Sequence, residues 1–341
     1  MGIIQFPNLF GGLTLYVDRV AFTLFEVPIY WYGLFIAFAF MLSLILAGRS
    51  AHKFKIKKDD LYDLILICAP IAIICARLFY VIFDWQNFKG DLGAIFNFRQ
   101  GGLAIYGAVI GAFGVAYFVC KKKKMIPLRV FDFAAPYFAI SQAIGRWGNF
   151  VNQEAFGVNT NLPWGMTGNR IKSYLQSQQD LLASQGMQVN PDLPVHPTFL
   201  YESLWNVGAF FLLIWLRKHK KVDGDVFFGY MILYGLGRSW VEGLRTDGLM
   251  LGSFRISQLL AGLFVIVFGA IWFYRRKKVP HMKQSDYYDP DFTFAQATSG
   301  EIQPKQETHS EYSDLVIEKR TEESKKKSHE KTEQSNGRSE E

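Results

Sequence analysis

The sequence predicts an all-α, polytopic membrane protein with seven transmembrane helices, its N-terminus outside the membrane and its C-terminus in the cytoplasm. Hydrophobic residues make up 50% of the 341 positions and 31 residues are Phe, a composition typical of a chain that contacts lipid. Seven apolar stretches approach the roughly 20 residues that a membrane-spanning helix needs. Basic residues follow every second stretch, and this asymmetry orients membrane proteins.

The seven stretches differ in strength. The fourth and the sixth are the weakest, because each contains an arginine, and a charge in hydrocarbon is costly. The stretches lie at about residues 27–48, 61–84, 101–120, 130–150, 198–217, 225–244 and 255–274.

Lysine and arginine are concentrated in alternate loops, which places those loops in the cytoplasm. The loops between them carry few basic residues, so the pattern supports both the orientation and the count of spans. The net charge of +7 is explained by these clusters, and we therefore expect no nucleic-acid partner. The clusters are Arg49 to Lys58, Lys121 to Lys124 with Arg129, Arg217 to Lys221, and Arg275 to Lys278.

The chain divides into a membrane-embedded domain, residues 1–278, and a charged tail, residues 279–341, that we expect to be disordered. The longest segment predicted outside is 151–197, and long loops in compact domains tend to be functional. Within it, the polar stretch from Lys172 to Asn190 is compatible with a short amphipathic helix.

Polar side chains of several predicted spans fall near one depth. At 1.5 Å per residue they lie within roughly 10 Å of the outer boundary, which predicts one outward-facing cavity. Buried charges of this kind are functional candidates, and two arginines with few carboxylates to neutralise them favour a phosphate ligand. The candidates are Tyr32, Arg77, Tyr106, Arg146, Asn149, His196, Glu202, Tyr234, Arg238, Glu242 and Arg245.

Structural explanations stay open for several of these positions. Arg238 and Glu242 are spaced to form an ion pair within one helix. Tyr32 and its neighbours fit an interfacial aromatic belt. Arg77 suits a structural role as well as a functional one, and Gly107 with Gly111 suits helix packing.

Five segments, taken together and in order, resemble the prolipoprotein diacylglyceryl transferase family over about residues 10–278. That family transfers a diacylglyceryl group from phosphatidylglycerol to the lipobox cysteine thiol of prolipoproteins, forming a thioether and releasing glycerol phosphate. The segments are Trp31-Tyr32-Gly33-Leu34, Gly101 to Gly107, Gly145 to Glu154, His196 to Glu202, and Tyr234 to Arg238 followed by Val241-Glu242.

The resemblance implies a role for each matching residue. Arg146 and Arg238 are implied to hold the phosphate, with Asn149, Asn152, Glu154 and Gly157 completing the phosphatidylglycerol site. Tyr32 and Tyr106 are implied to be catalytic, and the supporting residues are Arg77, His196, Glu202, Tyr234, Glu242 and Arg245. The implied partners are phosphatidylglycerol, membrane lipids and signal peptides with a lipobox cysteine. The implied location is the bacterial cytoplasmic membrane, with the site facing outward.

The group that accepts the thiol proton is left open. Many family members carry His where this chain has Tyr106, and a neutral phenol is a poor base at pH 7. His196 is one alternative, and a thiol pKa lowered by the two arginines is another. We expect no cofactor and no metal, because no cluster of His, Asp or Glu has ligand spacing.

A second class of function is a membrane transporter or channel for a small anionic solute, because buried charges and glycine-rich helices suit both. A transport path needs polar groups at both depths and commonly a duplicated half, and the sequence offers neither. A receptor or scaffold is favoured only by the number of helices and the long tail. A one-sided cavity would favour the enzyme.

Overall fold

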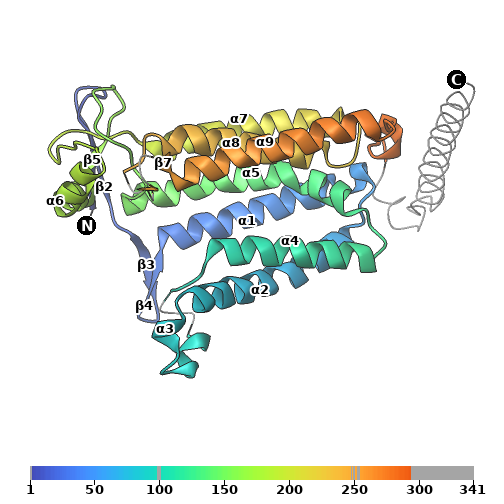
Figure 1. The fold of residues 1–341 in the computed structure, drawn as a ribbon, viewed down its shortest axis with the longest axis horizontal. Helices are drawn as coiled ribbons and strands as arrows, with labels where there is room; N and C mark the ends of the chain where they lie inside the picture. Colours follow the sequence, from blue (N-terminus) through green and yellow to red (C-terminus); the bar gives the residue numbers. More distant parts are fainter. Residues whose placement is uncertain (1, 98–100, 247, 249, 252–253, 293–341) are drawn as a thin grey trace, which may run out of the picture. The chain divides into compact units, whose positions relative to one another are not determined.

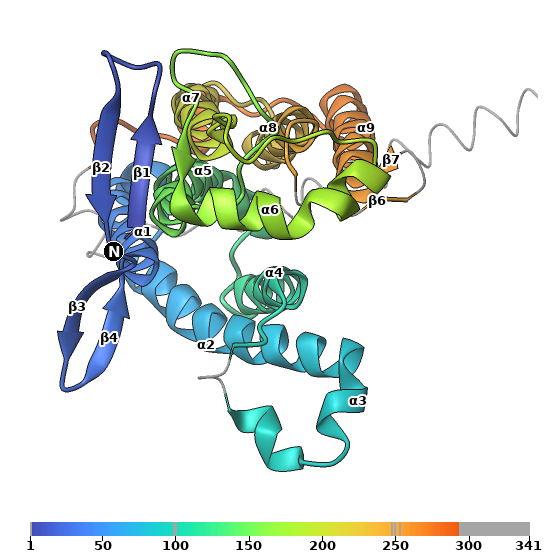
Figure 2. The same ribbon diagram turned by 90° about the vertical axis from the view of Figure 1, so that its left-hand side faces the viewer.

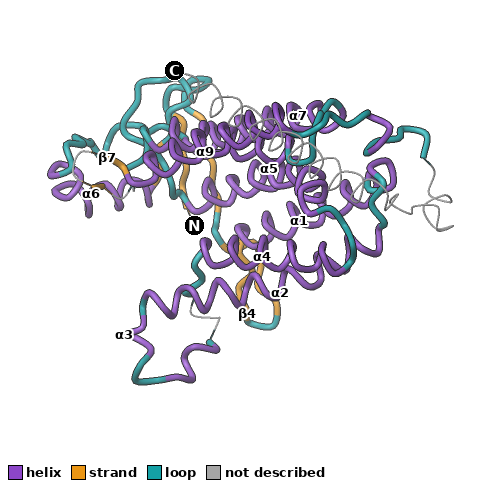
Figure 3. The backbone as a smooth tube through the Cα atoms, turned by 45° about the vertical axis from the view of Figure 1, so that its right-hand side comes forward, coloured by secondary structure: helices purple, strands orange, loops and turns teal. Residues whose placement is uncertain are grey.

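The computed structural model describes residues 2–97, 101–246, 248, 250–251 and 254–292. Helices dominate these residues, and seven of them have 18 residues or more (Figures 1 and 3). Each of the seven overlaps one of the predicted stretches, so the positions of the helices were predicted correctly. They are α1 Trp31–Ser50, α2 Lys58–Phe83, α4 Ile105–Lys122, α5 Pro127–Asn152, α7 Thr198–Lys218, α8 Asp225–Glu242 and α9 Ile256–Lys278.

Five of these helices are long and apolar enough to cross a membrane: α1, α2, α4, α7 and α9. The other two, α5 and α8, are those that carry Arg146 and Arg238. Helix α5 packs against α1, α7 and α8, so its polar groups face other helices. Length and apolarity therefore identify five spans, fewer than the seven predicted.

The described residues are mostly helical, as predicted, and they also contain short strands that the sequence did not indicate. All three sheets lie at the end of the helices where α5 and α8 finish and α7 begins, which we call the strand end (Figures 1 and 2). The sheets have the orders β2-β1-β5, β3-β4 and β6-β7. The strands are β1 Gly2–Phe6, β2 Leu13–Val17, β3 Val20–Leu24, β4 Val27–Tyr30, β5 Thr167–Gly168, β6 Met250–Leu251 and β7 Phe254–Arg255.

Residues 151–197 are ordered by a hydrophobic core at the strand end. Helix α6, Asn169–Ser184, places Ile171, Leu175 and Leu182 at steps of four and seven, so all three share one face and are buried. They cluster with Ile4 of β1 and Met166. The amphipathic helix expected between 172 and 190 therefore exists, although it starts and ends earlier.

The opposite end of the helices, which we call the basic end, carries the basic clusters. Basic residues occupy the last turns of α1, α4, α7 and α9. Positive charge in a last turn complements the helix dipole. All four helices thus point their basic ends the same way, as the alternation in the sequence predicted.

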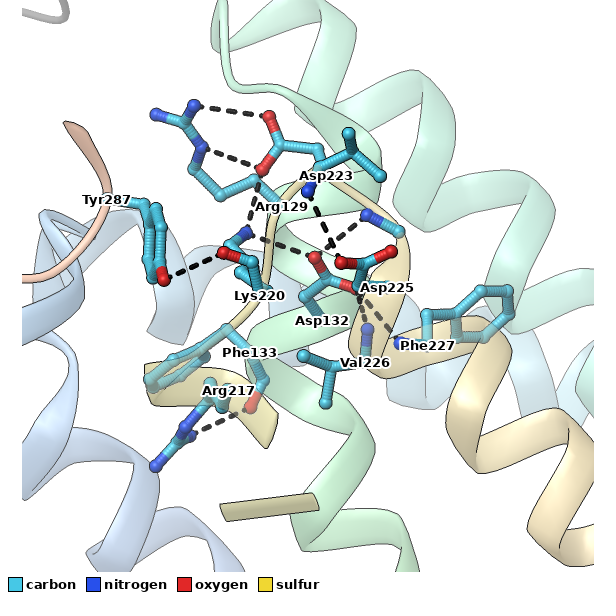
Figure 4. Close-up of polar contacts among 12 residues, drawn as sticks. Arg129, Asp132, Phe133, Arg217, Lys220, Asp223, Asp225, Val226, Phe227 and Tyr287 are labelled. Carbon is cyan, nitrogen blue, oxygen red and sulfur yellow. Dashed lines mark hydrogen bonds and ion pairs between the residues drawn. The ribbon is translucent and has the colours of Figure 1, made fainter. Parts of the chain in front are cut away.

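Buried polar groups tie the helices together at the basic end (Figure 4). Asp132 of α5 is 1% exposed and accepts hydrogen bonds from Lys220 Nζ at 3.0 Å and from three backbone N–H groups at the start of α8. It therefore caps α8 from a neighbouring helix. Arg129 pairs with Asp223 through two contacts of 3.1 Å. Asp132 lies 14 residues from Arg146, about 21 Å along α5, so it is no part of a site at the strand end.

The compact unit continues to Asp291, beyond the boundary expected at Lys278. Residues 279–291, which we call the C-terminal clasp, fold back over the basic end. Tyr287 is 2% exposed, and its hydroxyl donates to the carbonyls of Lys218 and Lys220 at 3.1 and 3.0 Å. Burial raises the pKa of Tyr287 to about 12, so the hydroxyl keeps its proton. The rest of the expected tail, residues 293–341, lies outside the described residues.

Candidate active site

Three helices bring charged side chains together at the strand end. Arg146 of α5 lies 2.7 Å from Glu202 of α7, between Nη2 and Oε2. Arg238 of α8 places Nη2 2.7 Å from Glu242 Oε2 and Nη1 3.9 Å from Glu202 Oε2. Both carboxylates are buried, with side chains 7% and 2% exposed. Two buried carboxylates thus hold both guanidinium groups in place, whereas the sequence analysis expected few carboxylates to neutralise them.

Arg146, Glu202 and Arg238 line a small pocket that is open to solvent. Arg146 and Arg238 keep about a fifth of their side chains exposed, at 23% and 22%. Arg146 Nε is buried and has no hydrogen-bond partner among the described residues. An N–H group of this kind is costly unless a ligand satisfies it. The pocket is lined by Arg146, Glu202, Trp205, Asn206, Tyr234, Gly237, Arg238 and Val241.

The charge of the pocket favours an anion. Arg245 Nη1 lies 3.6 Å from Glu202 Oε1, so the guanidinium groups of Arg146, Arg238 and Arg245 all lie near this one carboxylate. Guanidinium groups bind phosphate and carboxylate through paired hydrogen bonds. The arrangement therefore suits a ligand with at least one negative charge and several acceptor oxygens.

Trp205 and Asn206 line the pocket but were not singled out from the sequence, whereas Gly237 and Val241 stood only within a quoted family segment. Trp205 and Asn206 follow Glu202 by three and four residues, so helical spacing alone places them on the same face. Asn206 donates to the backbone carbonyl of Glu202 at 2.7 Å, and Trp205 donates to Leu233 at 2.9 Å. A Cβ at Gly237 would overlap the Trp205 indole, which explains the glycine there.

Arg245 reaches the site differently from the prediction. The sequence placed it on one helical stripe with Tyr234, Arg238 and Glu242, but α8 ends at Glu242. Arg245 instead lies in the following turn, where its backbone forms an isolated bridge with Gly157. A Cβ on Gly157 would come within 2.8 Å of His196 Cβ and 2.9 Å of the Leu244 carbonyl. Close packing is therefore a sufficient reason for this glycine, which does not line the pocket.

A second polar cluster lies at the end of α5. Glu154 Oε1 accepts hydrogen bonds from Asn149 Nδ2 at 2.9 Å and Asn152 Nδ2 at 3.2 Å. Arg19, which sequence reasoning left out of the site, donates from Nε to Asn152 Oδ1 at 3.1 Å. Asn149 is three residues beyond Arg146, so the two clusters are about 4.5 Å apart along the helix axis.

The two candidate catalytic tyrosines lie outside the pocket lining. Tyr32, at the start of α1, is 39% exposed, and its ring is so close to α5 that a Cβ on Gly148 would overlap it. Tyr106, in the first turn of α4, is 62% exposed. Arg77 is also outside the pocket, because the residue is 4% exposed and its guanidinium donates to backbone carbonyls. The single cavity predicted from depth thus contains only part of the candidate set.

His196 belongs to a third group at the strand end. Its Nδ1 lies 3.0 Å from the Tyr201 hydroxyl, which also accepts a hydrogen bond from Trp164 Nε1 at 2.9 Å. An indole only donates, so the Tyr201 hydroxyl has its own proton free to donate to Nδ1. Burial lowers the pKa of His196 below its ordinary value of 6.5, so the ring is neutral at pH 7. Among the described residues, no group of three or more His, Cys, Asp or Glu could hold a metal ion.

Comparison with known proteins extends over most of the chain. A sequence model of the prolipoprotein diacylglyceryl transferase family matches residues 19–298. A relative from Clostridioides difficile (strain 630) is 42% identical over 250 residues, which is 73% of this chain and 92% of the relative. Another from Finegoldia magna is 42% identical over 263 residues, 77% of this chain and 97% of the relative. A third from Bacillus cereus is 44% identical over 251 residues, 73% and 89% of the two chains. All three are named phosphatidylglycerol–prolipoprotein diacylglyceryl transferase.

Proposed function

The chain belongs to the prolipoprotein diacylglyceryl transferase family, and from that premise we propose how its residues perform the reaction. It is a transferase that moves the diacylglyceryl group of phosphatidylglycerol to prolipoproteins. The comparisons do not favour the transporter or channel considered from the sequence.

The acceptor is the thiol of a lipobox cysteine, and the reaction is a substitution at carbon. The sulfur forms a bond to the terminal glycerol carbon of the diacylglyceryl group, while the bond from that carbon to the phosphate oxygen breaks. The thiol proton is lost, and the leaving group is glycerol phosphate. A phosphodiester with one negative charge therefore becomes a monoester that gains charge as the bond breaks.

Arg146 and Arg238 stabilise this developing charge. The observation that carries the proposal is that two arginines from different helices line one pocket and are fixed by the same buried carboxylate, Glu202. Because they are held before the substrate arrives, little reorganisation is needed in the transition state. Glu242 and Arg245 complete the frame, and Tyr234 lines the same pocket.

The cluster at the end of α5 holds the glycerol head group. Asn149, Asn152 and Glu154 carry the donors and acceptors that a vicinal diol requires, and they lie next to Arg146 on the same helix. Tyr32 packs on that helix from α1, and Tyr106 contacts the donor lipid from α4.

The thiol is activated by the positive field of the arginines. A free thiol has a pKa of about 8.5, and a nearby guanidinium favours the thiolate. His196 is neutral at pH 7 and is therefore able to accept a proton, but its Nδ1 is occupied by Tyr201. The arginine field is consequently the better supported of the two alternatives.

All seven long helices cross the cell membrane of a bacterium, with the basic end in the cytoplasm and the strand end outside. The alternation of basic last turns supports this orientation. The proposed site then faces the side on which signal peptides emerge. Helices α5 and α8 tolerate their arginines because carboxylates lie close by, Glu202 of α7 beside Arg146 and Glu242 of α8 itself beside Arg238.

The test is a reaction of purified protein with phosphatidylglycerol and a lipobox peptide, followed by mass spectrometry. We expect the mass of one diacylglyceryl group to be added to the peptide and glycerol phosphate to be released in equal amount. A matched peptide with serine in place of the cysteine should stay unmodified. Addition of a single acyl chain, or equal modification of the serine peptide, would contradict the proposed substitution at carbon.

A further inference from the structure

Arg77 of α2 is buried, and its guanidinium gathers backbone carbonyls from two segments of the chain. It donates to Ala94, Ile95 and Asn97 at 2.8, 2.8 and 3.1 Å. It also donates to Gly101 and Gly102 at 2.7 and 2.9 Å. All three guanidinium nitrogens donate to these five carbonyls, an arrangement that needs the planar fork of an arginine and that a lysine cannot reproduce.

The segment that follows is built to approach this guanidinium closely. Gly101 and Gly102 have φ angles of 83° and 76°, the left-handed region that favours glycine. A Cβ on Gly102 would overlap Arg77 Nη1. Both glycines are therefore favoured by the backbone conformation, and Gly102 is also required by its contact with Arg77.

The same contacts fix the start of α4. The N–H of Ala104 donates to the Ala76 carbonyl at 3.0 Å, one residue before Arg77. A Cβ on Gly107 would overlap Phe79 Cβ and the Cys75 carbonyl, and one on Gly111 would come within 2.5 Å of Cys75 Cβ. Helices α2 and α4 are thus in close contact there. Tyr106 lies between these fixed points, in the first turn of α4.

We propose that Arg77 is a positioning residue for transfer, which acts by holding segments 94–97 and 101–104 so that Tyr106 meets the donor lipid. This rests on the proposed role of Tyr106. The pocket lined by Arg146 and Arg238 does not include Arg77. The five hydrogen bonds of Arg77 given above all reach backbone carbonyls of these two segments, so it acts on Tyr106 through the backbone that it holds.

A double-mutant cycle separates this role from general stabilisation. Turnover and the KM for phosphatidylglycerol are measured for wild type, Arg77→Lys, Tyr106→Phe and the double variant, each normalised to folded protein. We expect each single variant to lose about tenfold in kcat. The kcat of the double variant should be no lower than that of the slower single variant, because both substitutions remove the contact of Tyr106 with the donor lipid.

The matched control is Arg217→Lys, because Arg217 is also 4% exposed and donates to the Phe133 carbonyl at 3.1 Å, but at the basic end. Its kcat per folded molecule should match wild type. Multiplied losses in the double variant would show that Arg77 does not act through Tyr106. Wild-type turnover by folded Arg77→Lys, or by Tyr106→Phe, would also overturn the proposal. Absence of transfer by the wild-type protein would instead refute the proposed function.

Discussion

Replacing Arg238 by lysine keeps a positive charge in the pocket but removes the fork that reaches two carboxylates. In the structure, Nη2 lies 2.7 Å from Glu242 and Nη1 lies 3.9 Å from Glu202. One ammonium nitrogen cannot occupy both positions and also contact phosphate. Losing one preorganised contact to transition-state charge costs about 3 kcal/mol, or about a hundredfold in rate. We therefore expect Arg238→Lys to lose about a hundredfold in kcat, and Arg238→Gln to lose more.

The assay is turnover of phosphatidylglycerol with a lipobox peptide, measured on purified variants whose folded fraction is known. The matched control is Arg129→Lys, which alters an arginine–carboxylate pair of similar exposure, 25% against 22%, at the basic end. That variant should lose stability, while its kcat per folded molecule should stay at the wild-type value. Well-folded Arg238→Gln with wild-type turnover would refute the phosphate role and leave the buried carboxylates as the centre of the site.

Three further predictions concern topology, the C-terminal clasp and pH. In a variant without the native cysteines, a membrane-impermeant maleimide should label Gln179→Cys on intact cells. It should label His281→Cys only after permeabilisation, and the reverse pattern would contradict the proposed orientation. A chain ending at Asp291 should unfold at the same temperature as the full chain, whereas one ending at Lys278 should unfold at a lower temperature because it lacks the clasp; equal midpoints would show that the clasp contributes nothing. The pKa of His196 is lowered by burial, so stability is complete above pH 6.5 and should fall as the unfolded chain gains a proton below that value. His196→Gln should reduce this loss, and an unchanged pH profile would contradict the assignment.

Much of the helical framework was predictable, because the length of an apolar stretch and the basic residues at its end can be read from a short segment of the sequence. The stretch placed at 198–217, for example, is a helix from Thr198 to Lys218, with basic residues in its last turn. The strands were not predictable in the same way. Strand β1 has five residues and pairs with Leu13–Val17 and with Thr167–Gly168, so its stability depends on a partner more than 160 residues away.

The charged residues of the candidate site were singled out by their predicted depth in the membrane, because a charged side chain in hydrocarbon is costly and usually functional. Their partners were not, since Glu202 can meet Arg146 and Arg238 only after three helices have packed. Predicted depth also placed Arg77 and His196 in one cavity with Arg146 and Arg238, whereas in the fold they lie outside that pocket. Arg77 satisfies carbonyls of its own loop, and His196 pairs with Tyr201.

The sequence also does not reveal that the compact unit continues past Lys278 to Asp291. Residues 279–291 are polar and follow a basic cluster, a composition typical of a disordered tail. Tyr287 nevertheless finds two carbonyls at the end of α7, an arrangement that composition alone does not reveal.

The central claim is that Arg146 and Arg238 bind the phosphate group that leaves. The most direct measurement is the affinity of glycerol phosphate, the expected product, for wild-type protein and for Arg146→Gln, followed by the phosphorus NMR signal of the ligand. Wild-type protein should bind the dianion, and Arg146→Gln should bind it at least about tenfold more weakly, because a charge-assisted pair contributes roughly 1.5–3 kcal/mol. Equal affinity of the two folded proteins for glycerol phosphate would contradict the claim.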